Sequence, residues 1–219
     1  MIVRYYGHSM FMLQTEGGVT LVTDPYGDFY DYPRQKLRAD LVTVSHQHHD
    51  HNGLQMLTGT YTLFDHPGRF PQTQGIAITG LESLHDNANG TLRGANTIFR
   101  IELEGLNVVH LGDLGQIPTE AQRKAIGTPD VLMVPVGGIY TLDANAAYQT
   151  VQMLAPKVVI PMHYKTAFSA AMPIADEMPF LGCMRAQPEP MPLCRITKGD
   201  IGERPAVITL RVTVPDTHA

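Results

Sequence analysis

The sequence has few of the features that mark a secreted or nucleic-acid-binding protein. Its 219 residues include two cysteines, Cys183 and Cys194. Two thiols are too few for a disulfide framework in a chain of this length, so we expect a reducing, cytoplasmic compartment. Lysine and arginine are scattered, and the net charge is −5. Because surfaces that bind nucleic acids are normally basic, this composition argues against a nucleic-acid partner.

The chain also lacks long apolar segments. No apolar run approaches the roughly 18 residues that a membrane-spanning helix needs, so we expect no stable membrane insertion. The segment 1–7 has no basic head followed by an apolar stretch, which argues against a signal peptide. A hydrophobic content of 43% with 17% charged residues is ordinary for a protein that buries a core. We therefore expect one domain over residues 1–219, acting on a small molecule, with homo-oligomerisation left open.

The first half of the chain is patterned as short strands closed by turn residues. Glu16–Gly18 and Glu104–Gly105 have the composition of hairpin turns. A further short helix is expected over Asn52–Leu57. The predicted strands are Val3–Tyr6, Met10–Gln14, Val19–Thr23, Leu41–Ser45, Tyr61–Phe64, Ile76–Thr79, Asn96–Leu103 and Leu106–His110.

Helical patterns concentrate in the second half. Helices are predicted over Thr119–Ile126, which follows Pro118, and over Asp143–Leu154, which opens on an N-capping aspartate. The segment 176–205 contains five prolines and is expected to be a loop. Strands are predicted over Val131–Val136, Val158–Pro161 and Ala206–Val214. Strands in both halves, followed by helices, indicate two packed sheets with helices outside.

Residues 46–51 hold four histidines and one aspartate directly after the predicted strand that ends at Ser45. At a strand end, residues i and i+2 point the same way, so His46 and His48 can converge on one ion. The following turn would bring Asp50 and His51 toward a neighbouring position. Imidazole nitrogens and carboxylate oxygens suit zinc, manganese or iron, whereas a structural zinc finger would use cysteine.

This His-x-His-x-Asp-His pattern after a buried strand resembles the signature of the metallo-β-lactamase superfamily. Four further motifs of that superfamily match the chain in order, at Asp24, His85, Asp113 and His163. The segments around residues 89–96, 110–115 and 162–165 are similar to a small branch that includes L-ascorbate-6-phosphate lactonase and the phospholipase D that cleaves N-acyl phosphatidylethanolamines.

The resemblance implies an α+β fold, an αββα four-layer sandwich of two mixed sheets with helices on the outer faces. It implies two divalent metal ions, zinc foremost, with manganese or iron as alternatives. By this mapping His46, His48 and His85 hold the first ion, and Asp50, His51 and His163 hold the second. Asp113 spans both ions, since two neighbouring cations need a shared anionic ligand. A hydroxide between the ions would be the nucleophile, and Asp50 and Asp113 are the predicted catalytic residues.

The assignment of His85 as a metal ligand has two alternatives. Asp86 or His110 could take the place of His85 in the first metal site. Otherwise His110, like Asp24 and His8, is expected to lie behind the ligands. Metal-bound histidines usually donate their second nitrogen to such a neighbour.

Three further residues are expected on the open, substrate side: Tyr140, Tyr164 and Lys165, where a phenol or a cation would stabilise a developing negative charge. Alternatively, Tyr164 packs in the core and Lys165 is a surface charge. The predicted function is hydrolysis of an ester-like bond in a small molecule, either a lactone, a carboxylic ester or a phosphodiester. The alternatives are an iron-dependent oxidoreductase on the same scaffold and a metal-dependent binding protein without turnover.

Overall fold

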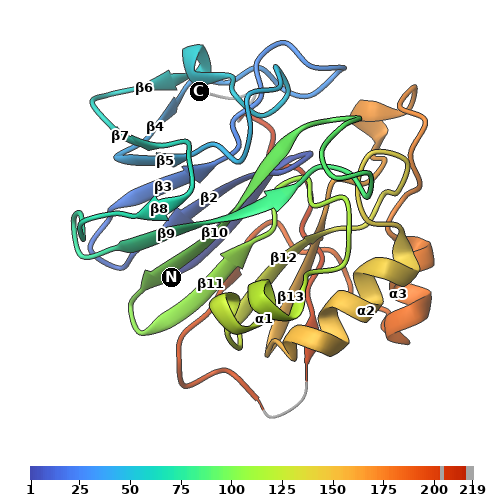
Figure 1. The fold of residues 1–219 in the computed structure, drawn as a ribbon. Coiled ribbons are helices and arrows are strands. Elements are labelled where there is room, and N and C mark those ends of the chain that lie inside the picture. Colours follow the sequence, from blue (N-terminus) through green and yellow to red (C-terminus); the bar gives the residue numbers. More distant parts are fainter. Residues whose placement is uncertain (203–204, 216–219) are drawn as a thin grey trace.

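Two β-sheets pack face to face in the computed structural model, which describes residues 1–202 and 205–215 (Figure 1). In these residues the first sheet has the strand order β14-β1-β2-β3-β5-β7. Strands β1, β2, β3 and β14 are antiparallel, and β5 and β7 then add in parallel. Its strands are β1 (Ile2–Gly7), β2 (Met10–Gln14), β3 (Thr20–Thr23), β5 (Leu41–Thr43), β7 (Thr62–Phe64) and β14 (Cys194–Arg195).

The second sheet has the order β15-β13-β12-β11-β10-β9-β8 among the described residues. Its strands are antiparallel from β8 to β11 and parallel from β11 to β15. They are β8 (Gly68–Arg69), β9 (Ala77–Leu84), β10 (Ala95–Leu103), β11 (Leu106–His110), β12 (Val131–Pro135), β13 (Val158–Met162) and β15 (Ala206–Val207). A separate pair joins β4 (Leu37–Arg38) to β6 (Leu57–Thr58).

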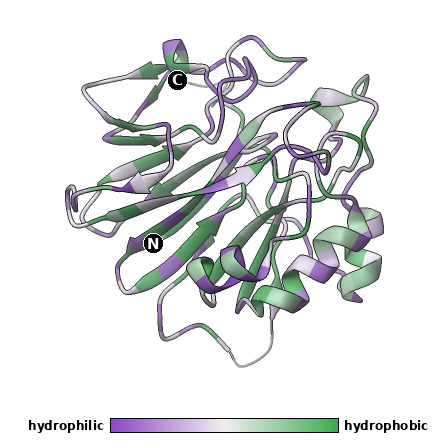
Figure 2. Ribbon diagram, viewed as in Figure 1, coloured by the Kyte–Doolittle hydropathy of each residue, from purple (hydrophilic) through white to green (hydrophobic). Residues whose placement is uncertain are grey.

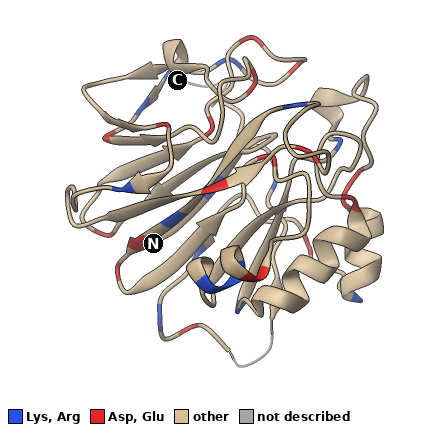
Figure 3. Cartoon of the chain, viewed as in Figure 1, with Lys and Arg blue, Asp and Glu red and all other residues tan. Residues whose placement is uncertain are grey.

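The main hydrophobic core lies between the two sheets, because every second side chain of a strand points to the same face of its sheet. On β2, Phe11 and Leu13 face this core and are fully buried. Met10 points to the opposite face of the same sheet and joins a second apolar cluster with Val22 and Val42. Figure 2 shows the central strands of both sheets coloured mostly as hydrophobic, and Figure 3 shows the charged residues scattered around them without a basic stripe.

The α-helices lie on the side of the second sheet (Figure 1). They are α1 (Glu120–Ile126), α2 (Ala144–Leu154) and α3 (Met178–Met184). Helix α1 begins after Thr119, whose side chain and that of Gln122 form a reciprocal capping box. Helix α2 begins after Asp143, whose carboxylate accepts a hydrogen bond from the Ala146 amide.

The outer face of the first sheet is covered by a loop between β3 and β4, in contrast to the helices on the second sheet. Tyr26, Phe29 and Tyr32, from the segment between β3 and β4, pack in its apolar cluster. The sandwich of two mixed sheets is thus confirmed, with its α-helices gathered on one outer face and an aromatic loop on the other. This loop matters for function because it also reaches the edge where the sheets meet.

Several predicted elements differ from the structure in type or extent. The helix expected over Asn52–Leu57 is a single 3₁₀ turn (Leu54–Met56), because the Gly53 amide donates to the Pro25 carbonyl and its backbone packs on Tyr26. The proline-rich segment 176–205 contains α3, since Pro179 occupies the first turn of a helix, where proline is tolerated.

The predicted strand Ala206–Val214 is also wrong in extent. It pairs with β13 only over Ala206–Val207. The chain then crosses to the first sheet, where Val212 forms an isolated bridge with Tyr5. Finally, among the described residues, no helix has the length and apolar character to cross a membrane.

Candidate metal centre

The predicted metal ligands meet at one edge of the sandwich, at the ends of strands from both sheets. Residues 46–51 follow β5, and His85 follows β9. Asp113 follows β11 and His163 follows β13, two parallel strands whose carboxyl ends share this edge. Segments far apart in the sequence are therefore brought together by the register of the sheets, as at other ligand sites beyond the carboxyl ends of strands.

The first group of potential ligands is His46, His48 and His85. The Nε2 atom of His46 is 3.0 Å from Nδ1 of His48. Burial lowers the pKa of His46 to about 3 and also lowers the pKa of His85. These imidazoles are therefore neutral near pH 7, which is the protonation state that binds a metal.

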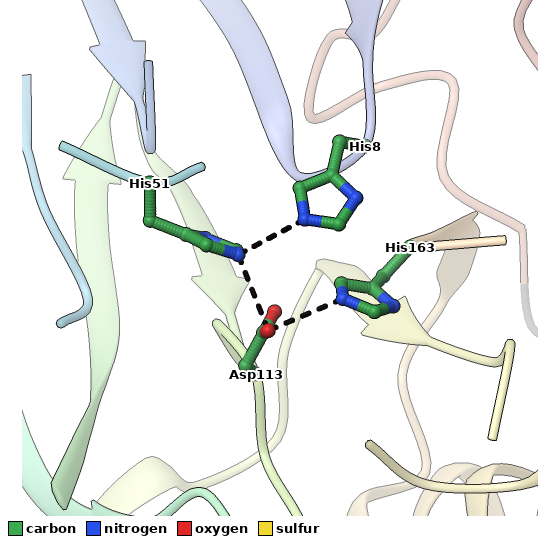
Figure 4. Close-up of side chains that lie close together, drawn as sticks. All are labelled: His8, His51, Asp113 and His163. Atoms are coloured by element: carbon green, nitrogen blue, oxygen red, sulfur yellow. Dashed lines mark hydrogen bonds and ion pairs between the residues drawn. The ribbon is translucent and has the colours of Figure 1, made fainter. Parts of the chain in front are cut away.

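The second group is His8, His51, Asp113 and His163, all buried (Figure 4). The Oδ2 atom of Asp113 is 3.2 Å from Nε2 of His51 and 3.2 Å from Nε2 of His163. The Nε2 atom of His8 is 3.1 Å from that of His51. Four donor atoms thus face one another across a small space.

The spacing of these atoms fits a transition metal. Zinc binds imidazole nitrogen at about 2.0–2.1 Å, and the edges of such a tetrahedron are about 3.3–3.4 Å long. The Asp113 carboxylate lies 3.2 Å from His51 and 3.3 Å from His85. Donor atoms so close together repel one another unless protons or cations lie between them. The residues present therefore fit bound metal ions.

Asp113 lies between the two groups. Its Oδ2 atom approaches His85 of the first group as well as His51 and His163 of the second. Burial would raise the pKa of this carboxyl, but the neighbouring imidazoles of His163 and His51 hold it well below its usual range. Asp113 is therefore ionised and is available to two sites at once.

Asp50 stands beside the second group. Its Oδ2 atom is 3.2 Å from Nε2 of His8 and 3.8 Å from Nε2 of His51. Burial opposes ionisation, yet the hydrogen bond from His8 and the charge of His51 lower the pKa of Asp50. Its side chain is 17% exposed, so this carboxylate reaches both the buried group and the cavity above it.

Asp24 orients the His51 ring by binding the ring nitrogen that faces away from the metal group. Its Oδ2 atom accepts hydrogen bonds from Nδ1 of His51 at 2.9 Å and from the Ser45 hydroxyl at 2.6 Å. This bond places a proton on Nδ1 and directs the Nε2 atom at the metal group. Burial lowers the pKa of His51, but the carboxylates of Asp113 and Asp24 outweigh burial and raise it well above its ordinary value.

The two rivals of His85 make other contacts. The Nε2 atom of His110 lies 2.9 Å from the Ser9 carbonyl, and its Nδ1 atom accepts from the Gly112 amide. Both ring nitrogens of His110 are therefore occupied. Asp86 points into its own loop, where its carboxylate accepts four backbone N–H groups, those of Ala88, Gly90, Leu92 and Arg93.

A cavity of about 430 Å³ opens above the ligands. Besides Tyr140 and the histidines and aspartates of residues 46–163, it is lined by Phe29, Tyr30, Arg93 and Met172, which come from three loops and which the sequence alone did not place in the site. The lining is Phe29, Tyr30, His48, His49, Asp50, His85, Arg93, Asp113, Tyr140, His163 and Met172.

Tyr164 and Lys165 do not lie in this cavity, and their expected place on the substrate side is wrong. The backbone at His163 is left-handed, with φ of 51°, which turns the chain away from the site directly after the ligand. The Tyr164 ring is 5% exposed and stacks on Tyr5 with ring centroids 6.0 Å apart. Both Tyr164 and Lys165 line a different hollow.

Comparison with known proteins agrees with this geometry. Residues 2–163 match the family described as the beta-lactamase superfamily domain. A UPF0173 metal-dependent hydrolase of Thermoplasma acidophilum is 29% identical over 191 residues, which cover 75% of this chain and 83% of the relative. A candidate Zn-dependent hydrolase of the metallo-β-lactamase superfamily from Thermotoga maritima has a solved structure that is 34% identical. The match has a TM-score of 0.80 and covers 96% of this chain and 98% of that one.

The fold also occurs in a protein with different chemistry. CmlA, a diiron β-hydroxylase from Streptomyces venezuelae, is 16% identical with a TM-score of 0.56, over 74% of this chain and 44% of its own. That likeness concerns the fold alone. The family match, the hydrolase relatives and the paired His/Asp groups agree with one another. The chain belongs to the metallo-β-lactamase superfamily, as one of its metal-dependent hydrolases.

Proposed function

We propose that the chain is a dinuclear hydrolase that cleaves an ester-like bond in a small molecule. His46, His48 and His85 would hold the first ion, and His51, His163 and Asp50 the second. The observation that carries this proposal is the position of Asp113, whose Oδ2 atom lies 3.2–3.3 Å from His85, His51 and His163. A carboxylate between the groups supplies the anionic bridge that two nearby cations need.

We extend the second site to include His8. Its Nε2 atom is within 3.2 Å of both His51 and Asp50, so it faces the same point as they do. Burial and the charge of His163 lower the pKa of His8 to about 4, which leaves the ring neutral and able to bind a metal. His8 is also held by its backbone, because its carbonyl accepts from the His163 amide at 2.7 Å. This placement differs from the position behind the ligands that the sequence suggested.

The donor set suits zinc best, with manganese and iron as alternatives. When bound, such ions would act as Lewis acids and would lower the pKa of a bound water toward neutrality. The chain's own contribution is orientation. Asp50 is ionised and reaches the cavity, so it can accept a hydrogen bond from the attacking water and direct its lone pair toward the substrate. The water oxygen then replaces the alcohol on the acyl carbon or phosphorus, and the proton leaves with the alcohol.

The size of the site favours a small substrate. A cavity of about 430 Å³ lies within the range of roughly 300–1,000 Å³ that is usual for small-molecule sites. Phe29, Tyr30, Tyr140 and Met172 give it apolar and aromatic surface, and its other lining side chains are histidines, aspartates and one arginine. A lactone, a carboxylic ester or a phosphodiester of a small molecule would fit these features.

The test is metal analysis followed by a hydrolase panel of lactones, carboxylic esters, thioesters and phosphodiesters. We expect about two transition-metal ions per chain and activity on at least one ester class. His48→Ala should abolish that activity, whereas His66→Ala, which changes an exposed histidine away from the ligands, should leave it unchanged. A protein that binds no transition metal, or an active His48→Ala variant, would contradict the proposal.

Iron-dependent oxidation is the second candidate, because the His and Asp donors also suit iron. Iron in the purified protein, visible absorbance and oxygen consumption in place of hydrolysis would favour it.

A further inference from the structure

The loop that follows His85 is built around one buried carboxylate. Asp86 is 1% exposed and accepts backbone N–H bonds along the loop, including that of Arg93 at 2.7 Å. The loop closes where the Gly94 carbonyl accepts from the His85 amide at 3.0 Å. Because the same short loop is tied to a metal ligand at one end, it holds Arg93 in a fixed place beside the metal centre.

The Arg93 side chain extends over the cavity. Its guanidinium carbon lies 5.4 Å from the centre of the Tyr140 ring, a cation–π arrangement that holds the plane of the guanidinium group. Among the described residues that line the cavity, Arg93 alone carries a lysine or arginine side chain. Its guanidinium forms no ion pair within residues 1–202 and 205–215. Its five N–H donors are therefore available to a ligand.

The cavity that Arg93 lines also has apolar surface. Phe29 and Met172 are buried in its wall. Tyr30, which lines the same cavity, is 42% exposed. A ligand in this cavity can therefore meet both a cation and apolar side chains.

We infer that the substrate is an anion with an apolar segment, and that Arg93 binds its negative group, a carboxylate or a phosphate. This inference rests on the proposed function, since it names the substrate class of the same site. The apolar segment lies against Phe29 and Met172, and the scissile bond lies over Asp113. Arg93 is a specificity residue: it selects the substrate and takes no part in bond cleavage.

The experiment uses ligands that bind without being hydrolysed. Alkanohydroxamates of four to eight carbons anchor to metal through the hydroxamate group and end in methyl. Their matched partners, the monohydroxamates of the dicarboxylic acids, end in a carboxylate. Calorimetry on the zinc-loaded protein compares the two series with the wild type and with Arg93→Gln, Arg93→Lys and Arg69→Gln. Arg69 is an exposed arginine on β8, outside the lining of the cavity.

The wild type should bind the carboxylate-ended ligand of the best length about tenfold more tightly than its methyl-ended partner, as one charge-assisted hydrogen bond allows. Arg93→Gln should remove this preference without changing the affinity for the methyl-ended series or the metal content. Arg93→Lys should restore part of the preference, and Arg69→Gln should retain all of it. In the methyl-ended series, affinity should rise with chain length.

A preference that survives in Arg93→Gln, or a wild type with no preference at any length, overturns the role of Arg93. Affinity that is independent of chain length overturns the apolar segment. Binding of the methyl-ended series without a carboxylate preference would leave the metal centre intact, whereas failure of every hydroxamate to bind the zinc-loaded protein would overturn the proposed function and this inference with it.

Discussion

Replacing Gly115 with alanine should disturb the metal centre through the backbone that carries its ligands, without changing a ligand side chain. Gly115 lies against the backbone of His85 and Asp86, and its amide donates to the Leu84 carbonyl at 3.0 Å. A Cβ atom at this position would lie 2.3 Å from the Asp86 nitrogen and 2.4 Å from the His85 carbonyl carbon. Both contacts are with backbone atoms, so no side chain can swing away to make room.

The size of the disturbance follows from these distances. Real Cβ contacts are essentially never under 3.0 Å, so one backbone must move by at least the difference, 3.0 − 2.3 = 0.7 Å. Metal–ligand distances tolerate about 0.2 Å. Either His85 or the segment of Gly115, which begins two residues after Asp113, is therefore displaced by more than a metal site tolerates. We expect metal affinity to fall about 10–100-fold, as it does when other groups that support a metal ligand are mutated. Overpacking should also lower the free energy of unfolding by about 1–3 kcal/mol.

The assay is competition for zinc against a chromophoric chelator, with thermal unfolding of the same samples. Gly182→Ala is the matched control, because its Cβ would meet nothing within 4 Å and it lies in α3. That variant should bind zinc as the wild type does, with stability unchanged or raised by about 0.5–1 kcal/mol. If Gly115→Ala retained wild-type zinc affinity, the close approach of these backbones would not determine the position of His85.

Further predictions concern the residues around the second group. Asp24→Asn should weaken zinc binding about 10–100-fold, since it removes the carboxylate that orients His51; unchanged affinity in the same titration would refute this role. His8→Ala should lower the metal content by about one ion per chain, whereas a full complement of metal and an unaltered spectrum of the cobalt-substituted protein would show that His8 binds none. The metal-free protein should lose stability as the pH falls from about 6.5 toward 4, because burial lowers the pKa of His8 to about 4 and of His46 to about 3. The unfolded chain then takes up protons that the folded chain does not. Melting of chelator-treated protein at pH 6.5, 5.5 and 4.5 checks this, and a flat profile would contradict it.

The ligand motif was visible in the sequence because its chemistry is local. His46, His48, Asp50 and His51 stand within six residues of one another in the turn that follows β5, so their closeness in the sequence already keeps them near one edge of the sheet. The long central strands and both capped helices were also predicted, since alternation and N-caps are short-range signals. Two-residue strands such as β4 carry no periodicity and could not be recognised.

What the sequence could not show depends on packing between distant segments. His8 reaches the second group because the turn after β1 has a left-handed residue, φ of 54° at His8, and because its carbonyl binds the His163 amide. Arg93 lies in the segment 89–96, whose resemblance to a branch of the superfamily gave this residue no role. Its position follows from a loop held by Asp86, whose carboxylate was itself an alternative metal ligand.

The length of β9 illustrates the same limit. The predicted strand Ile76–Thr79 stopped before Gly80, yet β9 continues through it to Leu84. A Cβ at Gly80 would lie 2.7 Å from the His66 carbonyl, so glycine is needed for the close approach of another loop and does not end the strand.

The proposed dinuclear site requires two metal ions that share Asp113. Anomalous diffraction at the zinc edge from crystals of the zinc-loaded protein tests it most directly. We predict two peaks about 3.5–4 Å apart, one beside His46, His48 and His85 and the other beside His51 and His163, with the Asp113 carboxylate between them. A single peak in fully loaded crystals, or two peaks that Asp113 does not join, would contradict the account.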